Sequence, residues 1–497
     1  MSNAPLTELL AAGLQLWRKG EQLGFKAPRG KMQPELRDRL VAAKPHLLEE
    51  LQEGCRYSLC SFAQQRLWFL EQLEGASPVY NVNGGLKIEG TLNTAAFRKS
   101  LQAVVQRHQA FRTAFRDEKG TPYQMIFDEI NVELPVVDLT SYGDNAENEL
   151  RNLMRAKSNE VFVLDQAPLI KTVLYKISEE HHVLFFMTHH IVFDGWSSGI
   201  VLRELSHLYE SETKGIESSL QPLEVDYSDH VIQQRNWFEG AEASRQLDYW
   251  NEKLAGELPV LEMPADKPRP AMQSTRGEMM FNQLSGDLIT KLHERAREEN
   301  VSLFMLLLAA SNILLARYTN QQDILLGMPV ANRKNKDLEN IVGFFANTLV
   351  LRNDMTGNPT FSELLQRTRE TTLQALNHED TPFEQIVESL RPERDLSRTP
   401  IFQAMISYEE DHLSNDFFGD LQTTALHVES QISRTDLTFW FYHGEGYLNV
   451  KLEYCIDLFN SESAERWMQS FETLLNAIAV DTSVAISELP VMPAQEE

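Results

Sequence analysis

The fold is decided by the stretch His182-Val-Leu-Phe-Phe-Met-Thr-His189-His190-Ile-Val-Phe-Asp194-Gly195-Trp-Ser-Ser-Gly199. Residues 183–187 form a continuous apolar run with aromatic side chains, and its short length favours a strand buried on both faces over a helix. Asp194-Gly195 is a turn signal, and apolar residues then recur at i, i+4 and i+7 from Val201, the spacing of a helix with one apolar face. The stretch therefore predicts a strand, a sharp turn and a helix.

The histidine doublet within this stretch indicates a catalytic base. Side chains alternate along a strand, so His189 and His190 point to opposite faces and cannot both hold one metal ion. One imidazole can then face a cavity as a neutral acceptor while the other is buried, with Asp194 forming an ion pair or fixing the turn. This layout is typical of a single-histidine base with a structural aspartate. The alternative is a pair of buried histidines that serve only the core.

The pattern His-His-x-x-x-Asp-Gly resembles the active-site motif of condensation domains of nonribosomal peptide synthetases, relatives of chloramphenicol acetyltransferase. Further stretches are similar to other motifs of that family, occur in the same order, and extend the resemblance over residues 57 to about 490. They are Ser61–Leu70, Arg107–Phe115, Tyr227–Asp229, Ile341–Thr348, His378–Glu384 and Arg394–Pro400.

The resemblance implies a mixed α/β (α+β) fold with two chloramphenicol-acetyltransferase-like lobes in a V-shaped pseudo-dimer. We expect an N-lobe over residues 57–222 and a C-lobe over 223–490, with the histidine motif in a tunnel entered from opposite faces. Residues 486–493 resemble the start of a linker to an adenylation domain, so residues 491–497 are expected to lead into that domain within a longer polypeptide.

Length and composition agree with a globular protein of two or three domains. The chain has 497 residues, 42% of them apolar and 24% charged, and exceeds the size at which one hydrophobic core keeps growing. The formal net charge of −26 argues against nucleic acid. The longest apolar run, residues 303–310, is too short to span a membrane and predicts a buried helix. Three cysteines without metal-ligand spacing fit the cytoplasm, and we expect a monomer that binds neither metal nor membrane.

The first 54 residues form a separate small domain in this interpretation. Apolar spacing predicts a helix from Leu6, strands over 14–17 and 22–25, a helix from Pro34 and another from Pro45, an αββαα order. Residues 1–52 hold eight basic and six acidic side chains, in contrast to the acidic remainder. The pattern resembles the N-terminal docking domains of megasynthase subunits, the type first seen in tubulysin assembly. The alternative is an extension that only packs on the main body.

The docking resemblance implies that the C-terminal tail of an upstream subunit adds to this domain as a strand. Cations near the predicted hairpin would favour an acidic tail. The residues expected to take part are Trp17, Arg18, Lys19, Leu23, Phe25 and Lys26, with Arg29 and Lys31 following.

In the main body, strands are predicted over 82–89, 169–177, 323–330, 402–408, 437–442 and 448–454, with a hairpin over 112–127 that turns at Lys119-Gly120. Helices are predicted over 94–107, 302–318, 361–375 and 464–478, and a mostly helical stretch over 225–254. The alternation of helices and strands indicates two successive α/β halves, and a cleft between halves is a common place for a site.

The implied reaction is attack of the amine of an acceptor aminoacyl-carrier on the thioester of a donor acyl-carrier or peptidyl-carrier. An α-amine has a pKa of about 7.7–8.0 and needs little activation. We expect His190, the second histidine of the family motif, to orient the amine and take its second proton. N–H groups of the helix that begins at Gly195 would stabilise the oxyanion. His189 and Asp194 are assigned to structure, and the resemblance offers Arg333 as the partner of Asp194.

Alternatives remain within and outside the family. An epimerisation domain would keep the same motif but usually follows a carrier domain, whereas a heterocyclisation domain would replace the first histidine by Asp. A non-catalytic carrier-binding relative is a third option, and the intact His190 counts against it. The opening motif, together with Tyr80-Asn-Val82, resembles the LCL-like subtype, which takes an L-configured or achiral donor. Gly195-Trp196-Ser197-Ser198-Gly199 also matches a hydrolase nucleophile elbow, although the later histidines are poorly placed for a triad. No bound cofactor is expected, because partner carriers present the substrates on 4′-phosphopantetheine arms.

Overall fold

The computed structural model describes residues 6–28, 30–393, 395–410, 418–426, 428, 431–444 and 446–492. They fold as two compact units, which we call unit 1 and unit 2. Unit 1 holds the described residues of Met1–Ser244, Ala331–Ala346 and Leu413–Val428, and unit 2 holds those of Arg245–Val330, Asn347–His412 and Glu429–Glu497. Described residues from three segments of the range expected for the second lobe, 223–244, 331–346 and 413–428, therefore fold with unit 1. The lobe boundaries proposed from the sequence stay a prediction.

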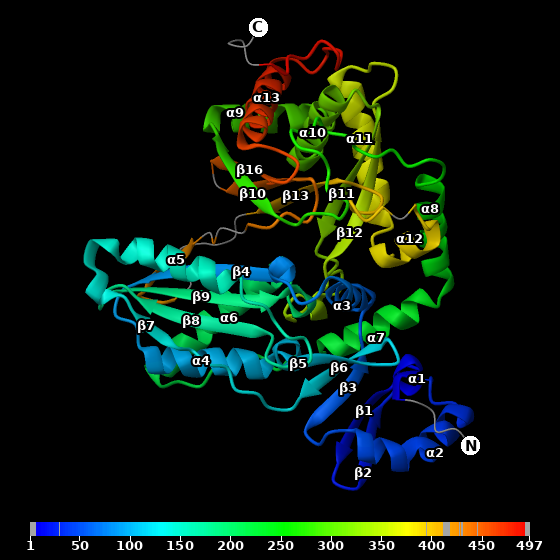
Figure 1. The fold of residues 1–497 in the computed structure, drawn as a ribbon, viewed down its shortest axis with the longest axis vertical. Coiled ribbons are helices and arrows are strands. Elements are labelled where there is room, and N and C mark those ends of the chain that lie inside the picture. The colour runs from blue at the N-terminus through cyan, green and yellow to red at the C-terminus, as the bar shows by residue number, and fades with distance from the viewer. Residues whose placement is uncertain are drawn as a thin grey trace. The chain divides into compact units, whose positions relative to one another are not determined.

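The predicted central strand lies in the middle of the first sheet of unit 1. The strand order is β14 (Gln422–Leu426), β4 (Asn81–Glu89), β9 (His181–His189), β8 (Ile170–Lys176) and β7 (Val136–Asp138). β9 pairs antiparallel with both β4 and β8. Helices α4 (Thr94–Arg107) and α5 (Ala146–Ser158) lie on opposite sides of this sheet, and α6 (Gly195–Lys214) packs beside α4 (Figure 1). The strand that carries the histidine doublet is thus buried within the sheet, as its apolar run predicts.

A second sheet of unit 1 joins the N-terminal hairpin to the main body. Its order is β2 (Gln22–Lys26), β1 (Gln15–Lys19), β3 (Cys55–Leu59), β6 (Thr121–Phe127) and β5 (Thr113–Glu118). The predicted hairpin over 112–127 is confirmed, and its turn residues Lys119 and Gly120 have positive φ. Figure 1 shows this sheet beside α1 (Leu6–Ala11) and α2 (Pro34–Glu50).

One helix, α2, replaces the two helices expected from Pro34 and Pro45, so the N-terminal order is αββα and the predicted αββαα order was wrong. Pro45 lies inside α2 and cannot donate a backbone hydrogen bond. The helix continues through it because a stripe of side chains on one face is buried, and that burial offsets the roughly 3 kcal/mol cost of an interior proline. The stripe consists of Leu36, Leu40, Ala43 and Leu47.

The remaining elements around unit 1 frame its two sheets. Helices α3 (Phe62–Glu74) and α7 (Tyr227–Phe238) carry the first and fourth family-like motifs. α8 (Ala241–Lys253) follows, and the chain passes into unit 2 along it, so the predicted helical stretch over 225–254 is confirmed as two helices. Short 3-10 segments lie at η1 (Pro78–Tyr80), η2 (Gln109–Arg112), η3 (Thr140–Asn145), η4 (His190–Val192) and η5 (Lys336–Leu338).

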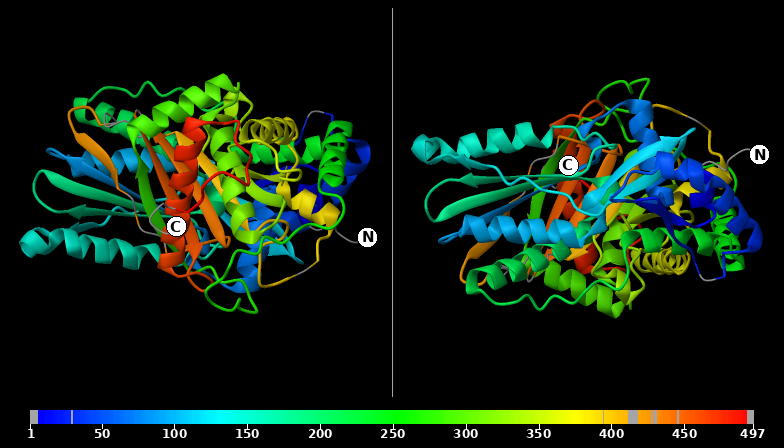
Figure 2. Two further views of the ribbon diagram at one scale, coloured as in Figure 1. Left: turned by 90° about the horizontal axis from the view of Figure 1, so that it is seen from above. Right: turned by 90° about the horizontal axis from the view of Figure 1, so that it is seen from below.

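Unit 2 is built on a mixed sheet of strand order β10 (Gly277–Leu284), β16 (Tyr447–Cys455), β15 (Leu437–Gly444), β13 (Ala404–Glu410), β11 (Asp323–Val330) and β12 (Asn347–Asp354). Its helices are α9 (Gly286–Glu298), α10 (Leu303–Thr319), α11 (Phe361–Asn377), α12 (Phe383–Leu390) and α13 (Ser461–Val480). Figure 2 shows α13, in red, lying across the strands of this sheet. The mixed α/β class predicted from the sequence is confirmed.

The apolar helix α10 forms the centre of the core of unit 2. Most of its side chains are buried, which confirms the buried helix predicted from the run at residues 303–310. Within the described part of the chain, no single helix has the length and apolar composition to cross a membrane. In that same part, only α9 and α10 taken together have the length and apolar composition of a membrane span, and the chain bends by 101° between them.

Candidate active site

The histidine doublet lies where β9 ends and a tight turn begins. β9 ends at His189, and His190 is the first residue of the 3-10 turn η4. The expectation that both histidines lie on the strand was therefore wrong by one residue, because the backbone turns immediately after His189. His189 is buried, whereas His190 is partly exposed. The turn leads through Phe193 and Asp194 into α6, which begins at Gly195.

Asp194 caps α6 and is a fully bonded buried carboxylate. It accepts hydrogen bonds from the backbone N–H of Ser197 at 2.9 Å and from the Ser197 hydroxyl at 2.7 Å. The backbone N–H of Phe345 donates to its second oxygen at 3.0 Å. This N-cap fixes the first turn of α6 directly after the histidine turn.

Arg333 forms the buried ion pair with Asp194. Its Nη2 lies 2.9 Å from Asp194 Oδ1, and both side chains are almost completely buried. The same guanidinium donates to the carbonyls of Leu338 and Ile341 and lies 3.9 Å from the centroid of the Phe345 ring. Burial lowers the pKa of Arg333, and the charge of Asp194 opposes that shift. The pair thus holds the segment 333–345 against the start of α6.

Segment 333–345 brings an aromatic ring onto His190. The ring centroids of Phe344 and His190 are 4.7 Å apart in an edge-on arrangement. The Tyr227 hydroxyl donates to the Phe344 carbonyl at 2.7 Å. A Cβ atom at Gly343 would lie 2.1 Å from the Tyr227 ring, so only glycine allows this close approach. α7 therefore positions the segment that covers one side of the His190 imidazole.

A second buried histidine, His108, also contacts this segment. His108 Nδ1 accepts a hydrogen bond from the backbone N–H of Val342, and His108 Nε2 lies 2.8 Å from Glu204. Burial raises the pKa of Glu204, but hydrogen bonds and charges from His108 and Arg107 outweigh it, so the net pKa is lowered. Sequence reasoning missed Glu204, although His108 lies in a quoted motif and Glu204 lies on the helix that follows the doublet.

His189 is bonded on both ring nitrogens within unit 1. Its Nδ1 accepts from the backbone N–H of Ile191 at 3.1 Å, and its Nε2 lies 3.2 Å from the Glu71 carboxylate on α3. Rings of Tyr80 and Phe162 lie about it, with centroids at 6.2 and 6.1 Å. Glu71 was missed from the sequence, where it looks like one of many acidic residues on a surface helix.

His230 on α7 is another titratable group close to the ion pair. Its ring lies 4.6 Å from that of Phe345. Burial, and then the positive charge of Arg333, lower the pKa of His230 to about 4. His230 is therefore neutral at physiological pH.

The serine of the Gly195–Gly199 pattern has a structural role. Ser197 is buried, and its hydroxyl donates to Asp194 and lies 3.1 Å from the Gly343 carbonyl. Arg333 and the Gly343 N–H also contact this oxygen. Since a nucleophile elbow requires an exposed serine hydroxyl, the hydrolase alternative loses its geometric basis. The cysteines Cys55, Cys60 and Cys455 are buried as well, and burial raises the pKa of each thiol.

The N-terminal hairpin ends the second sheet of unit 1. Lys19 and Gln22 flank its two-residue turn, so alternate pairing directs the backbone N–H and C=O groups of Leu23 and Phe25 away from β1. Among the residues that the structure describes, β2 has no neighbouring strand on its other side, so these groups face an open edge of the sheet. The Phe25 side chain is 46% exposed at this edge. Trp17 packs on Gly24, where a Cβ would lie 2.2 Å from the indole Nε1.

Most of the cations expected beside this edge already have partners in the chain. Arg18 donates to the carbonyls of Gly20 and Leu48. Lys26 pairs with Asp229 at 2.6 Å, and Lys31 pairs with Glu239 at 2.6 Å. Lys19 is exposed. Arg29 lies outside the described residues, as does Arg394 of the last motif. The sequence therefore overstated how much positive charge the hairpin has available for a partner.

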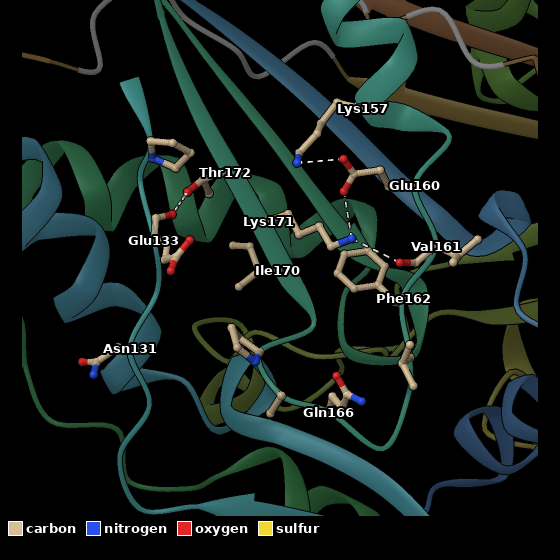
Figure 3. Close-up of a pocket in the computed structure, with 14 residues that line it drawn as sticks. Asn131, Glu133, Lys157, Glu160, Val161, Phe162, Gln166, Ile170, Lys171 and Thr172 are labelled. Atoms are coloured by element: carbon tan, nitrogen blue, oxygen red, sulfur yellow. Dashed lines mark hydrogen bonds and ion pairs between the residues drawn. The ribbon is translucent and has the colours of Figure 1, made fainter. Parts of the chain in front are cut away.

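A separate pocket of about 490 Å³ lies beside the edge of β8 (Figure 3). Its charged residues are largely paired with one another: Glu160 bridges Lys157 and Lys171, at 2.8 and 2.9 Å. Phe162 lines the pocket and also contacts the His189 ring. Among the described residues, no cluster of His, Cys, Asp and Glu side chains is suited to hold a metal ion.

Comparisons with known proteins match two families to this chain. The family model for the condensation domain matches residues 56–497, and that for the TubC N-terminal docking domain matches residues 5–53. One of the linear gramicidin synthase proteins of Brevibacillus parabrevis is 42% identical over 439 residues, 88% of this chain. The chain spans only 8% of that protein's length.

Two solved structures have a similar fold. The X-domain from teicoplanin biosynthesis superposes with a TM-score of 0.79 at 26% identity, covering 87% of this chain and 97% of that one. The four-domain nonribosomal peptide synthetase AB3403 superposes with a TM-score of 0.80 over 91% of this chain and 35% of its own. At 24% identity, this second match shows likeness of fold alone.

Proposed function

Because the chain belongs to the condensation domain family of nonribosomal peptide synthetases and begins with a TubC-type docking domain, we propose that it joins two carrier-bound substrates through an amide bond. The amine of an acceptor aminoacyl-carrier attacks the thioester carbonyl of a donor acyl-carrier or peptidyl-carrier. The new C–N bond forms, the C–S bond breaks, and the proton lost by nitrogen reaches the leaving thiolate. Both substrates arrive on the 4′-phosphopantetheine arms of partner carrier domains.

His190 is the residue that we propose to handle the proton. The observation that carries this assignment is its position: it is partly exposed at the end of β9, while His189 beside it is buried and bonded on both ring nitrogens. An edge-on Phe344 ring restricts the orientation of the imidazole. A positioned histidine can orient the neutral amine and accept its second proton.

The start of α6 supplies N–H donors whose partial positive charge complements the oxyanion. An oxyanion develops on the thioester oxygen during attack, and donors fixed in advance stabilise it. The first N–H groups of a helix lack intrahelical partners, so those that begin at Gly195 suit this role. Asp194 and Arg333 keep that helix start in place and serve structure in this account.

Recruitment is the second part of the proposal. The open edge of β2 suits an extended peptide that adds as a further strand, with its backbone bonded to Leu23 and Phe25. We propose the C-terminal tail of an upstream synthase subunit as this peptide, and an L-configured or achiral donor, as in the LCL-like subtype. The exposed Lys19 and Phe25 fit a tail with acidic and apolar side chains.

The test is mass spectrometry of carrier-bound products after the chain is mixed with loaded donor and acceptor carriers. We expect the condensed product on the acceptor arm, and a loss of about 10² to 10⁴ in rate for a folded His190→Ala variant. Wild-type turnover by this variant would contradict the assignment of His190. A donor epimerised in place would favour an epimerisation domain, and absence of any reaction would favour a carrier-binding relative.

A further inference from the structure

Helix α3 holds the histidine turn through two polar side chains on one face. Gln64 and Glu71 are seven residues apart, two helical turns, and so lie on the same side of α3. The Gln64 amide donates to the Ile191 carbonyl at 3.0 Å. The Glu71 carboxylate lies 3.2 Å from His189 Nε2. Both polar groups of the Ile191 backbone are thereby bonded, since its N–H donates to His189 Nδ1.

These contacts define the hydrogen positions on His189. Its Nδ1 accepts a backbone N–H and therefore carries no proton of its own. The ring proton is then on Nε2, where it is donated to Glu71. In this state His189 acts as the N-cap of the turn that begins at His190. The carboxylate fixes the ring so that Nδ1 faces the Ile191 N–H.

We propose that Glu71 is a positioning residue for His190, acting through His189. The inference rests on the proposed amide-forming function and extends it by one residue outside the histidine motif. His190 is followed directly by Ile191, so the peptide between them is fixed only if the Ile191 N–H stays on His189. Loss of the carboxylate frees the His189 ring to rotate, and the turn that orients the catalytic imidazole loosens.

Glu71 and His189 are both buried, and this burial strengthens the hydrogen bond between them. The Glu71 side chain is 5% exposed and that of His189 is 1% exposed. A hydrogen bond to a charged group in such surroundings is stronger than one in water. Glu204 and His108 form the same arrangement elsewhere in unit 1, with Val342 in the place of Ile191. Unit 1 thus uses a buried carboxylate twice to direct a histidine Nδ1 at a backbone N–H.

The test compares Glu71→Leu, Glu71→Gln and the control Gln72→Leu, which places the same side chain at the next, exposed position of α3. Single-turnover amide formation is measured against loaded-carrier concentration. We expect Glu71→Leu to lower the maximal rate roughly 10-fold, less than the 10²-fold that a 1 Å misplacement can cost, with half-saturation unchanged. Glu71→Gln keeps an acceptor oxygen and should recover most of the rate. Gln72→Leu should match the wild type.

A second readout does not depend on activity. The Ile191 amide signal in NMR spectra of the full chain reports its bond to His189, and Glu71→Leu should shift it and speed its hydrogen exchange, whereas Gln72→Leu should not. An unchanged signal and rate in a folded Glu71→Leu would overturn the proposal, as would a rate loss that Glu71→Gln does not reduce. If Glu71→Leu does not fold, Glu71→Ala, which also removes the carboxylate, takes its place with the same expectations. An inactive wild type would refute the function, while the Ile191 signal would still test the role of Glu71.

Discussion

The histidine turn and the N-terminal hairpin both belong to unit 1, but they treat their polar groups in opposite ways. At the turn, the side chains of Asp194, Arg333 and His189 are buried, and each is held by several partners. At the hairpin, Leu23 and Phe25 turn backbone groups to an open edge, and the flanking cations form exposed ion pairs. The first arrangement fixes one geometry, as chemistry requires. The second arrangement leaves outward backbone N–H and C=O groups to which an added strand could form hydrogen bonds.

The hairpin is nevertheless fixed firmly to the body. β1 pairs with β3, and the buried Gln15 donates to Ser228 on α7. The neighbouring Tyr227 supports Phe344, which lies on His190. The docking and packing interpretations of the first residues are therefore compatible: one edge of the hairpin packs on the body, and the other stays open.

The largest expected effect is at the turn, from Asp194→Ala. This change strands the buried charge of Arg333, at a cost of about 3 to 5 kcal/mol in the free energy of unfolding. Chemical denaturation should detect it, with loss of activity. Arg333→Ala should be no worse when combined with Asp194→Ala than alone. If Asp194→Ala had the same free energy of unfolding as the wild type, the turn would be no more rigidly held than the hairpin.

The next largest effect is expected in the pH dependence of the free energy of unfolding, and it arises from His230 beside the ion pair. The pKa of His230 is lowered to about 4, so between pH 6.5 and 4 only the unfolded chain binds this proton. The contribution of neutral His230 to the free energy of unfolding is therefore complete above pH 6.5, and about 3 kcal/mol of it is lost as the pH drops to 4. His230→Phe should flatten this part of the stability profile. Equal slopes for the wild type and His230→Phe would contradict the burial argument.

A smaller effect is expected where hairpin and body meet. Gln15→Leu leaves the buried Ser228 hydroxyl without this donor and should cost about 1 to 3 kcal/mol. Gln22→Leu, on the exposed strand β2, should stay within about 0.5 kcal/mol of the wild type. Thermal unfolding of the full chain compares the two. Similar melting temperatures for both variants would indicate that β1 is only loosely attached.

The sequence predicted local elements well and long-range neighbours poorly. The helix over 94–107 and the strand over 323–330 are confirmed with the same bounds, because apolar spacing and turn residues lie within the segments themselves. The strand β14 was not predicted, since its partner β4 lies more than 300 residues earlier in the chain. Pro45 was read as a helix start because its local signal ignores the burial of the α2 stripe.

For the candidate site as well, local sequence patterns indicated some residues, while contacts between distant segments could not be predicted. His190, Asp194 and Gly195 were proposed from one contiguous pattern, and Arg333 only through the family resemblance. Tyr227 lies in a quoted motif, but its contact with Phe344 joins distant segments and could not be predicted. Glu71 and Glu204 also act through contacts between distant segments, and no spacing in the sequence indicates them. The edge residues Leu23 and Phe25 were named, but the partners of Lys26 and Lys31 became visible only in the folded chain.

We propose that the turn performs the chemistry while the open hairpin edge recruits the donor subunit. The most direct test measures the rate of amide formation against the concentration of the upstream subunit for three chains: the wild type, His190→Ala and Phe25→Pro, whose proline removes an outward N–H of β2. We predict that His190→Ala lowers the plateau without moving the half-saturating concentration. Phe25→Pro should raise the half-saturating concentration and keep the plateau. A lowered plateau with unchanged half-saturation for Phe25→Pro, or a wild-type plateau for His190→Ala, would contradict this division of roles.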